Sequence, residues 1–334
     1  MTVLIVRLGA LGDIVHAIPA VAALRRAYPG ARIDWLVDLR HRAIVDLVDG
    51  VDRVVAVDSR SLAGWTHAVR ELRAVRYDVA IDLQGLLKSA VLARASGAGK
   101  VIGFSIFHLR EKAARPFYSE VGDGDEAHVV RQNLRLLAAV GVNDRAMAFP
   151  LKEIASPAVP ALRAQIGAAA RFALINAGAA WPNKRWPAAR FGELAAFLRE
   201  ACGLVPVVLW GPGEEPLADE VVAASGGAAV KAPPTGIADV VALAREAALF
   251  VSGDTGPLHL AVAAGAPIVS IFGPTNPARN GPIAPDDIVA SRYEACACHY
   301  DRRCHEQVWC LSTLAAAEVC AAVQRRIGAR GGRG

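Results

Sequence analysis

Short apolar runs alternate with stretches of helical spacing along the whole chain, which predicts an open parallel sheet covered by helices. Runs rich in valine, isoleucine and leucine, such as residues 3–6, are typical of strands buried on both faces. Residues 105–130 break the alternation and predict a long functional loop with some helix. In the first half we expect strands at 3–6, 32–37, 54–57, 78–83 and 100–104, and helices at 14–28, 41–48, 62–75, 86–95 and 129–140.

The second half repeats this alternation after a linker between Pro150 and Pro160. The chain is therefore predicted to be α/β, with two Rossmann-like, doubly wound domains that face each other across a cleft. We expect the domains at 1–155 and 161–310, followed by a C-terminal helix and frayed tail at 311–334. The strands of the second domain are expected at 172–176, 206–209, 249–252 and 267–272, and its helices at 188–202, at 237–247, at 311–327 and from residues 216 and 257.

Length and composition limit the class of protein. A chain of 334 residues exceeds the usual size of one core, and 54% hydrophobic with 21% charged residues describes a well-packed globular protein. No apolar run reaches the ~18–20 residues of a spanning helix, and the chain enters a strand at once, so we expect a cytoplasmic location. The net charge of +5 lies mainly in residues 1–150. No helix-turn-helix or zinc-finger pattern indicates nucleic acid, so the excess favours an acidic small molecule or an anionic lipid surface.

The run at 249–277 holds the densest set of residue types that bind ligands. A tight turn after a predicted strand contains Asp254, Thr255 and Gly256, and a proline suits the first position of the helix that follows. His259 projects from the first turn of that helix. Small and hydroxyl-bearing residues at a helix N-terminus favour an anion, so we expect a ligand with phosphate and hydroxyl groups. The spacing is neither that of a P-loop nor the glycine pattern of dinucleotide sites.

Other polar side chains fall in strand-to-helix loops, and each has a plainer alternative. Asp13 follows the first predicted strand and serves either as a helix N-cap or as a general base. Lys184 lies in a loop of small residues, where it either neutralises phosphate oxygens or is simply solvated. Gln84 and Lys88 follow the fourth strand and Arg110 lies in the long loop, so these three either face the predicted cleft or are ordinary surface groups.

Four cysteines lie close together near the C-terminus, with two histidines among them. A structural zinc site needs four such ligands, but the spacing Cys-x-Cys-x5-Cys-x5-Cys differs from that of the usual knuckles. Plain thiols, a redox or disulfide role and a metal site remain open as alternatives. The cysteines concerned are Cys296, Cys298, Cys304 and Cys310.

Taken together, these residues resemble those of the bacterial ADP-heptose:lipopolysaccharide heptosyltransferases, glycosyltransferase family 9, which have the GT-B fold. The resemblance runs from residue 4 to about residue 277. Four runs in this order make it specific: Gly12-Asp13, Asp82-x-Gln84-Gly85-x-x-Lys88-Ser89, Lys184-x-Trp186-Pro187 and Asp254-Thr255-Gly256-x-x-His259.

The resemblance implies an inverting glycosyltransferase that moves a heptose from ADP-heptose to the Kdo or heptose inner core of lipopolysaccharide. In the second domain, Lys184 would hold the diphosphate and Glu214 the adenosine ribose, while the loop from Asp254 to His259 would contact donor phosphate and heptose. No cofactor is implied, because Lys184 and the helix N-terminus can stabilise the departing ADP without a metal.

In the first domain the resemblance makes Asp13 the general base on the acceptor hydroxyl, with Gln84, Lys88 and Arg110 facing the acceptor. That acceptor would be Kdo-lipid A or heptosyl-Kdo-lipid A, which implies transient contact with the inner face of the cell membrane. Arg110-Glu111, followed by Phe117-Tyr118, resembles the type that adds the first heptose. The cysteine-rich tail resembles the type that adds the second, so types I and II both remain open.

Two alternatives have different functions. One is an enzyme of the same architecture that uses another nucleotide sugar and acceptor, or that epimerises a sugar nucleotide. The other is a non-catalytic binder of nucleotide sugars. The presence of a base, a diphosphate lysine and a donor loop in one chain favours the enzyme.

Overall fold

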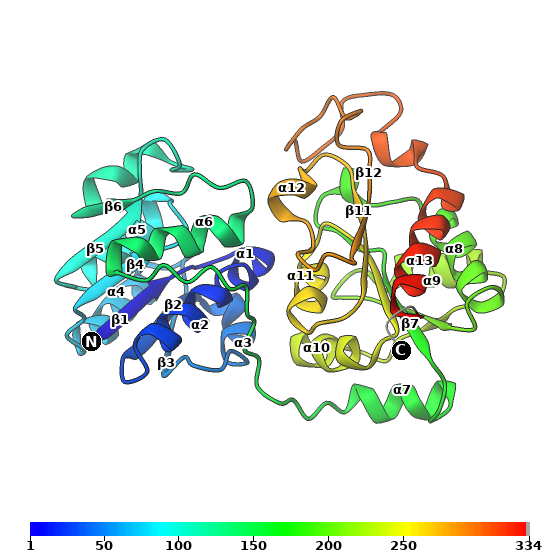
Figure 1. Cartoon of the computed structure of the whole chain (residues 1–334), viewed down its shortest axis with the longest axis horizontal. Helices are drawn as coiled ribbons and strands as arrows, with labels where there is room; N and C mark the ends of the chain where they lie inside the picture. Colours follow the sequence, from blue (N-terminus) through cyan, green and yellow to red (C-terminus); the bar gives the residue numbers. More distant parts are fainter. Residues whose placement is uncertain (332–334) are drawn as a thin grey trace. The chain divides into compact units, whose positions relative to one another are not determined.

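The computed structural model describes residues 1–331, and the chain divides into two compact units, Met1–Glu153 and Ile154–Gly334. Each unit contains one six-stranded sheet in which all pairs are parallel, with helices on both sides of the sheet (Figure 1). This arrangement follows from the buried aliphatic strands, because a parallel sheet needs helices to cover both of its faces.

The sheet of the first unit has the strand order β3-β2-β1-β4-β5-β6, the Rossmann order. Helix α2 packs beside α6, and α4 packs beside α5. The strands are β1 Thr2–Val6, β2 Arg32–Asp38, β3 Arg53–Val57, β4 Val79–Asp82, β5 Lys100–Phe104 and β6 Glu120–Gly122. The helices, with short 3-10 helices marked η, are α1 Leu11–Val15, α2 Ile18–Ala27, η1 Leu39–His41, α3 Arg42–Val45, α4 Leu62–Arg73, α5 Leu87–Ala95, η2 Lys112–Phe117, α6 Val129–Leu136 and η3 Leu137–Val140.

The register of the central strands places three strand-to-helix loops side by side. Val6 at the end of β1 lies opposite Leu36 of β2 on one side and Asp82 of β4 on the other. Because all the strands are parallel, the loops that begin near residues 7, 39 and 83 leave from the same edge of the sheet. We call this edge the carboxyl edge.

The prediction of a single helix at 14–28 is wrong, because the structure has two helices there. Helix α1 ends at Val15 and α2 begins at Ile18. Pro19 has no N–H group, so it cannot donate to the carbonyl of Val15 as a continuous helix would require. A proline is acceptable near the start of α2, where the amide has no helical partner in any case.

The segment at 105–130 was expected to be a long loop with some helix, and it also contains a strand. The 3-10 helix η2 packs against α5, and β6 adds an edge strand beside β5. With only three residues, β6 is too short to give an alternating pattern in the sequence.

The second unit has the order β12-β11-β10-β7-β8-β9, the same Rossmann order when its strands are numbered within the unit. Two of its strands, β9 and β12, were not expected from the sequence, and α7 begins inside the predicted linker. The strands are β7 Phe172–Asn176, β8 Val205–Leu209, β9 Val230–Lys231, β10 Leu249–Gly253, β11 Ile268–Phe272 and β12 Ile288–Ser291. The helices are α7 Ala158–Ile166, η4 Pro182–Lys184, α8 Ala188–Glu200, α9 Glu215–Ala224, α10 Ile237–Glu246, α11 Gly256–Ala263, α12 Pro277–Asn280, η5 Cys310–Thr313 and α13 Ala316–Gly331.

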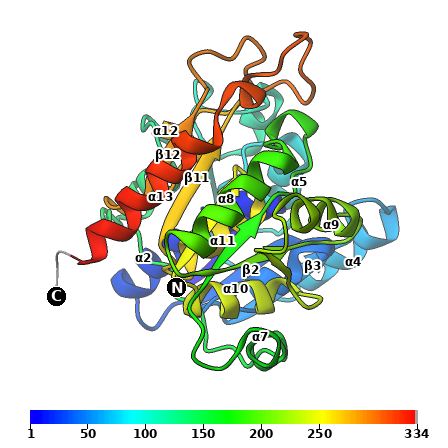
Figure 2. The same cartoon turned by 90° about the vertical axis from the view of Figure 1, so that its right-hand side faces the viewer.

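Helix α13 returns to the second unit and closes its core. It packs along α8 and the β11–β12 side of the sheet (Figure 2). Trp186 is buried beside Phe191, and its indole N–H donates to the carbonyl of Leu314 at 2.9 Å. This contact fixes the end of the loop that follows β7. Residues 328–331, which were expected to be frayed, continue α13 to Gly331, and residues 332–334 of the predicted tail lie outside the described residues.

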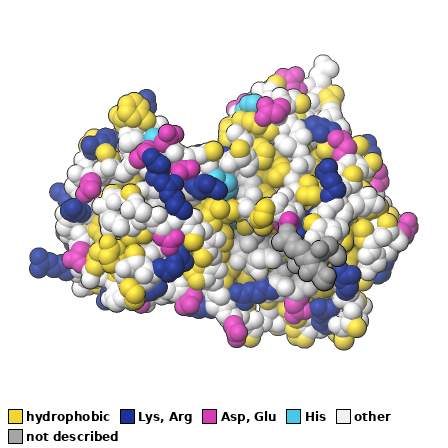
Figure 3. Space-filling model, viewed as in Figure 1, with side chains coloured by type: hydrophobic (Ala, Val, Ile, Leu, Met, Phe, Trp, Pro, Cys, Tyr) yellow, Lys and Arg dark blue, Asp and Glu magenta, His cyan; other side chains and the backbone are white. Residues whose placement is uncertain are grey.

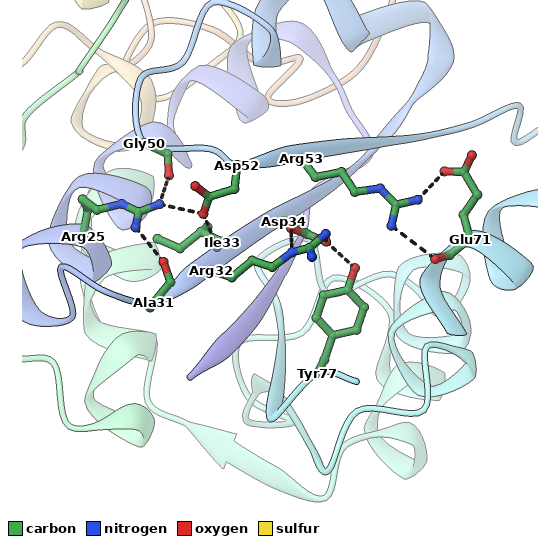
Figure 4. Close-up of polar contacts among 10 residues, drawn as sticks. All are labelled: Arg25, Ala31, Arg32, Ile33, Asp34, Gly50, Asp52, Arg53, Glu71 and Tyr77. Atoms are coloured by element: carbon green, nitrogen blue, oxygen red, sulfur yellow. Dashed lines mark hydrogen bonds and ion pairs between the residues drawn. The ribbon is translucent and has the colours of Figure 1, made fainter. Parts of the chain in front are cut away.

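At the opposite edge of the first sheet, charged side chains fasten the loops that enter the strands (Figure 4). The Arg25 guanidinium donates to the carbonyls of Ala31 and Gly50, at 2.6 and 2.7 Å. Asp34 is fully buried in β2 and accepts hydrogen bonds from Tyr77 Oη at 2.7 Å and from Arg32. These contacts stabilise the first sheet at the edge opposite the carboxyl edge. The loops at the carboxyl edge are therefore available to bind ligands.

Within residues 1–331, no helix combines the length and the apolar character needed to cross a bilayer.

Candidate active site

Asp13 lies inside the short helix α1 at the carboxyl edge of the first unit. Its Oδ1 forms an ion pair with Arg7 Nη2 at 3.0 Å, and its Oδ2 lies 3.5 Å from Arg110 Nη1. Oδ2 also accepts the backbone N–H of Ala10 at 3.3 Å, so Asp13 is the third residue of α1, bonding back to the N-cap Ala10, and not the N-cap itself. The side chain is 30% exposed, so the carboxylate is both anchored and open to solvent.

Arg7 is a functional candidate of the first unit that the sequence did not indicate. It follows β1 directly and is almost fully buried, and this burial lowers the pKa of its guanidinium while Asp13 acts in the opposite direction. Its Nη1 donates to the carbonyl of Leu83, and its Nε has no hydrogen-bond partner within the described residues. A buried cation against Asp13 favours the charged carboxylate and holds its orientation. An arginine ending an apolar strand was the only signal in the sequence.

Gln84 is buried and supports the loop that carries Asp13. Its Oε1 accepts the backbone N–H of Leu8 at 2.6 Å, so the amide braces the β1–α1 loop. Next to it, Asp82 is also buried, and burial raises the pKa of its carboxyl group. Asp82 accepts hydrogen bonds from Tyr118 Oη at 2.7 Å and from Ser89 Oγ at 2.8 Å, which join β4 to α5 and η2.

Arg110 lies in the loop after β5, as expected, whereas Lys88 lies in helix α5 rather than in the loop that follows β4. Lys88 is half-buried in the first turn of α5, and the Arg110 side chain is 55% exposed. Glu111 fastens the two loops together, since its carboxylate accepts the backbone N–H of Leu87 at 2.7 Å. The first unit therefore gathers a carboxylate and several cations at one edge.

In the second unit, Asp254 is the centre of a buried cluster of polar side chains. The carboxylate follows β10, and its Oδ2 is 2.6 Å from Lys184 Nζ and accepts the Thr275 hydroxyl at 2.6 Å. Its Oδ1 lies 3.2 Å from Nε2 of His259 in α11. Three loops and one helix thus meet on a single acidic side chain.

The environment of Asp254 keeps it ionised. Burial alone would raise the pKa of the carboxyl group, but the hydrogen bond and charge of His259, together with Lys184, outweigh it and hold the pKa well below its ordinary value. Lys184 is also placed by Trp181, because its Nζ lies 4.4 Å from the centre of the indole ring. The lysine side chain is 15% exposed, so a ligand can still reach its ammonium group.

Hydroxyl and amide groups fasten the loop that follows β7 to the start of α11. Asn176 Nδ2 lies 3.1 Å from the side-chain oxygens of both Thr255 and Ser252 and from the carbonyl of Gly178. Gly253 fits against the backbone here, since a Cβ at this position would lie 3.0 Å from the carbonyl oxygen of Lys184.

Glu214 closes the other side of this cluster from the start of α9. Its carboxylate accepts the backbone N–H of Gly211 at 3.1 Å. A Cβ on Gly178 would lie only 2.3 Å from the Glu214 carboxylate, so the two residues are in direct contact. The Gly178 carbonyl also accepts a hydrogen bond from the Asn176 side chain. Glu214 therefore lies at the same edge of the second sheet as Lys184 and Asp254.

The cysteine-rich segment brings its thiol groups close to one another without forming disulfides. Cys298 Sγ and Cys304 Sγ are 3.4 Å apart, and burial and a hydrogen bond to Cys296 raise the pKa of Cys310 to about 12. All the cysteines are free thiols. Across residues 1–331, no group of three or more His, Cys, Asp or Glu side chains is arranged to hold a metal ion, so the zinc alternative lacks a ligand set there.

The structure thus brings the candidates into two groups, one in each unit. Asp13, Lys88 and Arg110 share the carboxyl edge of the first unit, whereas Gln84 lies beneath that edge as a brace. The second unit assembles the candidates Lys184, Glu214, Asp254, Thr255, Gly256 and His259.

Two side chains of the second group were not predicted. Asn176 ends β7, and Thr275 lies in the loop after β11, where the sequence showed only a turn with glycine and proline. The available signal was a polar residue at the end of β7 and another in the loop that follows β11.

Comparison with known proteins gives consistent matches. Residues 65–310 match the family model described as glycosyltransferase family 9 (heptosyltransferase). The lipopolysaccharide heptosyltransferase 1 of Pseudomonas aeruginosa is 34% identical over 84% of this chain and 81% of the relative. The lipopolysaccharide heptosyltransferase 1 of Escherichia coli K12 is 31% identical over 83% of this chain and 89% of the relative.

A solved structure also matches over nearly the whole length. The Escherichia coli heptosyltransferase WaaC, determined with ADP, superposes with a TM-score of 0.79 and 25% sequence identity. The match covers 98% of this chain and 100% of that structure.

Proposed function

Because the chain belongs to glycosyltransferase family 9, the heptosyltransferases, we propose that it transfers a heptose from ADP-heptose to the Kdo or heptose inner core of lipopolysaccharide. The observation that carries this proposal is the cluster of Lys184, Asp254 and His259 at the carboxyl edge of the second sheet. One structure that this chain resembles holds ADP, which supports the choice of nucleotide.

The second unit binds the donor in this proposal. Lys184 has one N–H engaged by Asp254, and an ammonium group has further N–H donors for the diphosphate oxygens. The Thr255 hydroxyl and the backbone at Gly256 begin α11, where an anion is stabilised by unpaired N–H groups. Glu214, in contact with Gly178, accepts the ribose hydroxyls.

The first unit binds the acceptor and supplies the base. Asp13 accepts the proton of the acceptor hydroxyl as that hydroxyl attacks the anomeric carbon. Arg7 keeps the carboxylate charged and oriented at 3.0 Å, whereas Arg110 is exposed and more distant at 3.5 Å. An anionic acceptor can therefore attract Arg110 and Lys88 and leave Oδ2 of Asp13 available for the hydroxyl.

The reaction is a single displacement with inversion. The bond from the acceptor oxygen to the heptose forms as the bond from the heptose to ADP breaks, and Asp13 takes the proton. The negative charge that develops on ADP is stabilised by Lys184 and the N–H groups at the start of α11. Gln84 acts through the β1–α1 loop and positions Asp13 rather than contacting the acceptor.

The names of the relatives support one choice of acceptor type. Both of the relatives compared above are named heptosyltransferase 1, which favours type I and an acceptor that has not yet received a heptose. A lipid-linked acceptor also places the protein in the cytoplasm with transient contact at the inner face of the cell membrane.

The test is a transfer assay with the purified chain. We expect ADP release and the mass gain of one heptose on a Kdo-bearing acceptor when ADP-heptose is supplied, and no transfer from UDP-sugars. Tight binding of UDP, or transfer from a UDP-sugar at a comparable rate, contradicts the proposed donor. A heptosylated acceptor that reacts faster than the Kdo acceptor would reassign the chain to type II.

A further inference from the structure

We propose that Arg302 and Arg303 bind the diphosphate of the nucleotide sugar, in a pocket that the cysteine-rich segment forms beside Lys184. This inference rests on the proposed function and deepens it, because it assigns two further residues to the donor site. All the residues concerned belong to the second unit.

The cysteine-rich segment leaves the second sheet at the edge where the donor cluster lies. Strand β12 is parallel to β11, and β11 is parallel to β10. The chain after Ser291 therefore starts beside the loop that carries Thr275, which in turn lies next to the loop that carries Asp254. In Figure 1 the segment is the orange trace that follows β12. The topology thus brings residues 292–310 to the donor edge.

Two hydrogen bonds fasten this segment to loops of the donor cluster. The backbone N–H of Tyr300 donates to the carbonyl of Pro274 at 2.9 Å. The side-chain amide of Asn183 donates to the carbonyl of Asp301 at 3.0 Å. The residue after Pro274 and the residue after Asn183 are two of those whose side chains contact the Asp254 carboxylate. Each bond therefore lies one residue away from the cluster, and the two arginines come next in the chain.

A pair of thiols holds the ends of the loop that carries the arginines together. Cys298 Sγ and Cys304 Sγ are 3.4 Å apart, and the backbone N–H of His305 lies 3.4 Å from Cys298 Sγ. Within this loop, Tyr300 has a φ of 60°, the one positive value for a non-glycine residue in the described chain. A bulky residue keeps this conformation only where contacts such as its bond to Pro274 enforce it. The arginines are thus presented by a fixed turn.

The two arginines line a pocket of about 530 Å³ together with the loop that follows β7. We call it the arginine pocket, and its lining residues are Ala180, Trp181, Pro182, Arg302 and Arg303. The indole of Trp181 also contacts Lys184, whose Nζ lies 4.4 Å from the ring centre. The pocket and the donor lysine therefore share one side chain, so a ligand held by Lys184 has the pocket as its neighbour.

The donor cluster needs cations from outside it to bind a diphosphate. It contains two carboxylates, those of Asp254 and Glu214, and the single ammonium group of Lys184, which Asp254 already pairs at 2.6 Å. A diphosphate adds further negative charge at short range, so the cluster alone would repel it. Arg302 and Arg303 supply two positive charges in the adjoining pocket and reverse that balance.

Both guanidinium groups are available to a ligand. Arg302 and Arg303 are exposed, and neither forms an ion pair or a side-chain hydrogen bond within residues 1–331. The nearest acidic residues in the sequence, Asp301 and Glu306, do not line the pocket. On the face of the second unit that Figure 3 shows, basic side chains are dispersed. Arginine binds phosphate oxygens through parallel N–H groups, which suits two adjacent phosphates.

An acidic group of the acceptor is the other source of an anion, and it fits less well. The pocket belongs entirely to the second unit, where Lys184, Thr255 and Glu214 bind the donor in the proposed function. The acceptor is bound by the first unit in that proposal. We therefore commit to the donor diphosphate, and binding of the acceptor becomes one outcome of the test.

The experiment measures the Kd for ADP by calorimetry on the full chain. The pocket variant is Arg302→Gln with Arg303→Gln. The matched control is Arg199→Gln with Arg325→Gln, which removes two exposed arginines from α8 and α13 of the same unit and changes the net charge equally. A third variant, Arg302→Lys with Arg303→Lys, keeps the charge in the pocket.

We expect the native chain and the control to bind ADP equally and the pocket variant to bind it at least about tenfold more weakly, because charge-assisted hydrogen bonds to phosphate are lost. The lysine variant should bind ADP more tightly than the pocket variant. Equal ADP affinity of the pocket variant and the control overturns the proposal. A lysine variant as weak as the pocket variant also overturns it, because the loss would then come from a disturbed loop and not from the missing charge.

Activity measurements separate this inference from the proposed function. The pocket variant should raise the KM for ADP-heptose and leave the KM for the acceptor unchanged. A raised acceptor KM with native ADP affinity assigns the pocket to an acidic group of the acceptor and overturns the proposal.

The two proposals can also fail independently. A native chain that binds ADP through the pocket but transfers no heptose refutes the proposed function alone. Heptose transfer by a native chain whose pocket variant keeps its ADP affinity refutes the present inference alone. If the native chain binds UDP and not ADP, the proposed donor is refuted, and the same comparison of variants with UDP decides the role of the pocket.

Discussion

Replacing Asp254 by asparagine tests whether the buried cluster in the second unit depends on one ionised carboxylate. The substitution preserves shape and removes the charge that Lys184 meets at 2.6 Å. The side chains of Asp254 and Lys184 are only 5% and 15% exposed, so water can replace little of the lost interaction. Removing one partner of such a buried pair costs about 3–5 kcal/mol of unfolding free energy.

The reciprocal substitution, Lys184→Met, should lower the unfolding free energy by less than Asp254→Asn does. In Lys184→Met, Asp254 keeps the Thr275 hydroxyl and His259, at 2.6 and 3.2 Å, so its charge remains compensated. The double variant removes both charges together. We expect its loss of unfolding free energy to be smaller than the sum of the two single losses by at least about 1–2 kcal/mol.

Tryptophan fluorescence during urea unfolding measures these free energies in the relevant unit. Four of the six tryptophans lie in the second unit: Trp181, Trp186, Trp210 and Trp309. Glu193→Gln is the matched control, because its pair with Arg190 lies on the surface and should contribute less than about 1 kcal/mol. If the losses of the two single variants sum to the loss of the double variant within about 0.5 kcal/mol, the claim that the two residues form one buried pair is refuted.

The pH dependence has a definite sign. Because the pKa of Asp254 is lowered in the folded chain, its contribution is complete above the pKa of about 3.9 of an unfolded aspartate. It is lost as the pH falls below that value towards the folded pKa. The stability of Asp254→Asn should therefore fall less steeply than that of the native chain when the pH is lowered through 4.

Three further predictions concern single contacts. Tyr77→Phe removes a 2.7 Å hydrogen bond to the fully buried Asp34 and should lower the unfolding free energy by about 1–3 kcal/mol, measured by urea unfolding; an unchanged free energy contradicts the role of this bond. Since the pKa of Cys310 is raised to about 12, this thiol should react slowly with iodoacetamide at pH 8, which peptide mass mapping can follow. Gly178→Ala places a Cβ 2.3 Å from the Glu214 carboxylate, so calorimetry should find weaker ADP binding in the folded variant, and native affinity would exclude Glu214 from the nucleotide site.

The sequence predicted most of the architecture because long buried strands leave a clear trace. The family expected from the four motifs is confirmed by the family model and the relatives, and the GT-B fold is confirmed by the two parallel sheets and the match to WaaC. The strands that were missed, β6, β9 and β12, have three, two and four residues. Elements of that length are stabilised by their neighbours in the sheet and leave little periodic pattern.

Contacts between distant residues explain what the sequence could not reveal about the site. Arg7 belongs to the Asp13 group because the register of β1 against β4 brings it to the Leu83 carbonyl. Thr275 joins Asp254 because β10 and β11 are neighbours in the sheet. Neither of these two contacts can be predicted from the spacing of residues along the chain.

Gln84 illustrates the opposite difficulty. Its place in a motif-bearing loop suggested contact with the acceptor, but the side chain is buried and holds Leu8. The surroundings of Gln84, rather than its place in the motif, are therefore the reason why the proposed function gives it the role of shaping the β1–α1 loop.

The most direct test of the account is heptose transfer by Asp13→Asn at saturating ADP-heptose, with ADP affinity measured on the same preparation. The account predicts that kcat falls by about 10²–10⁴-fold, because the base is lost, while the Kd for ADP stays within twofold of native. An unchanged kcat would remove Asp13 from the role of base. A loss of ADP affinity parallel to the loss of kcat would contradict the division of labour between the two units.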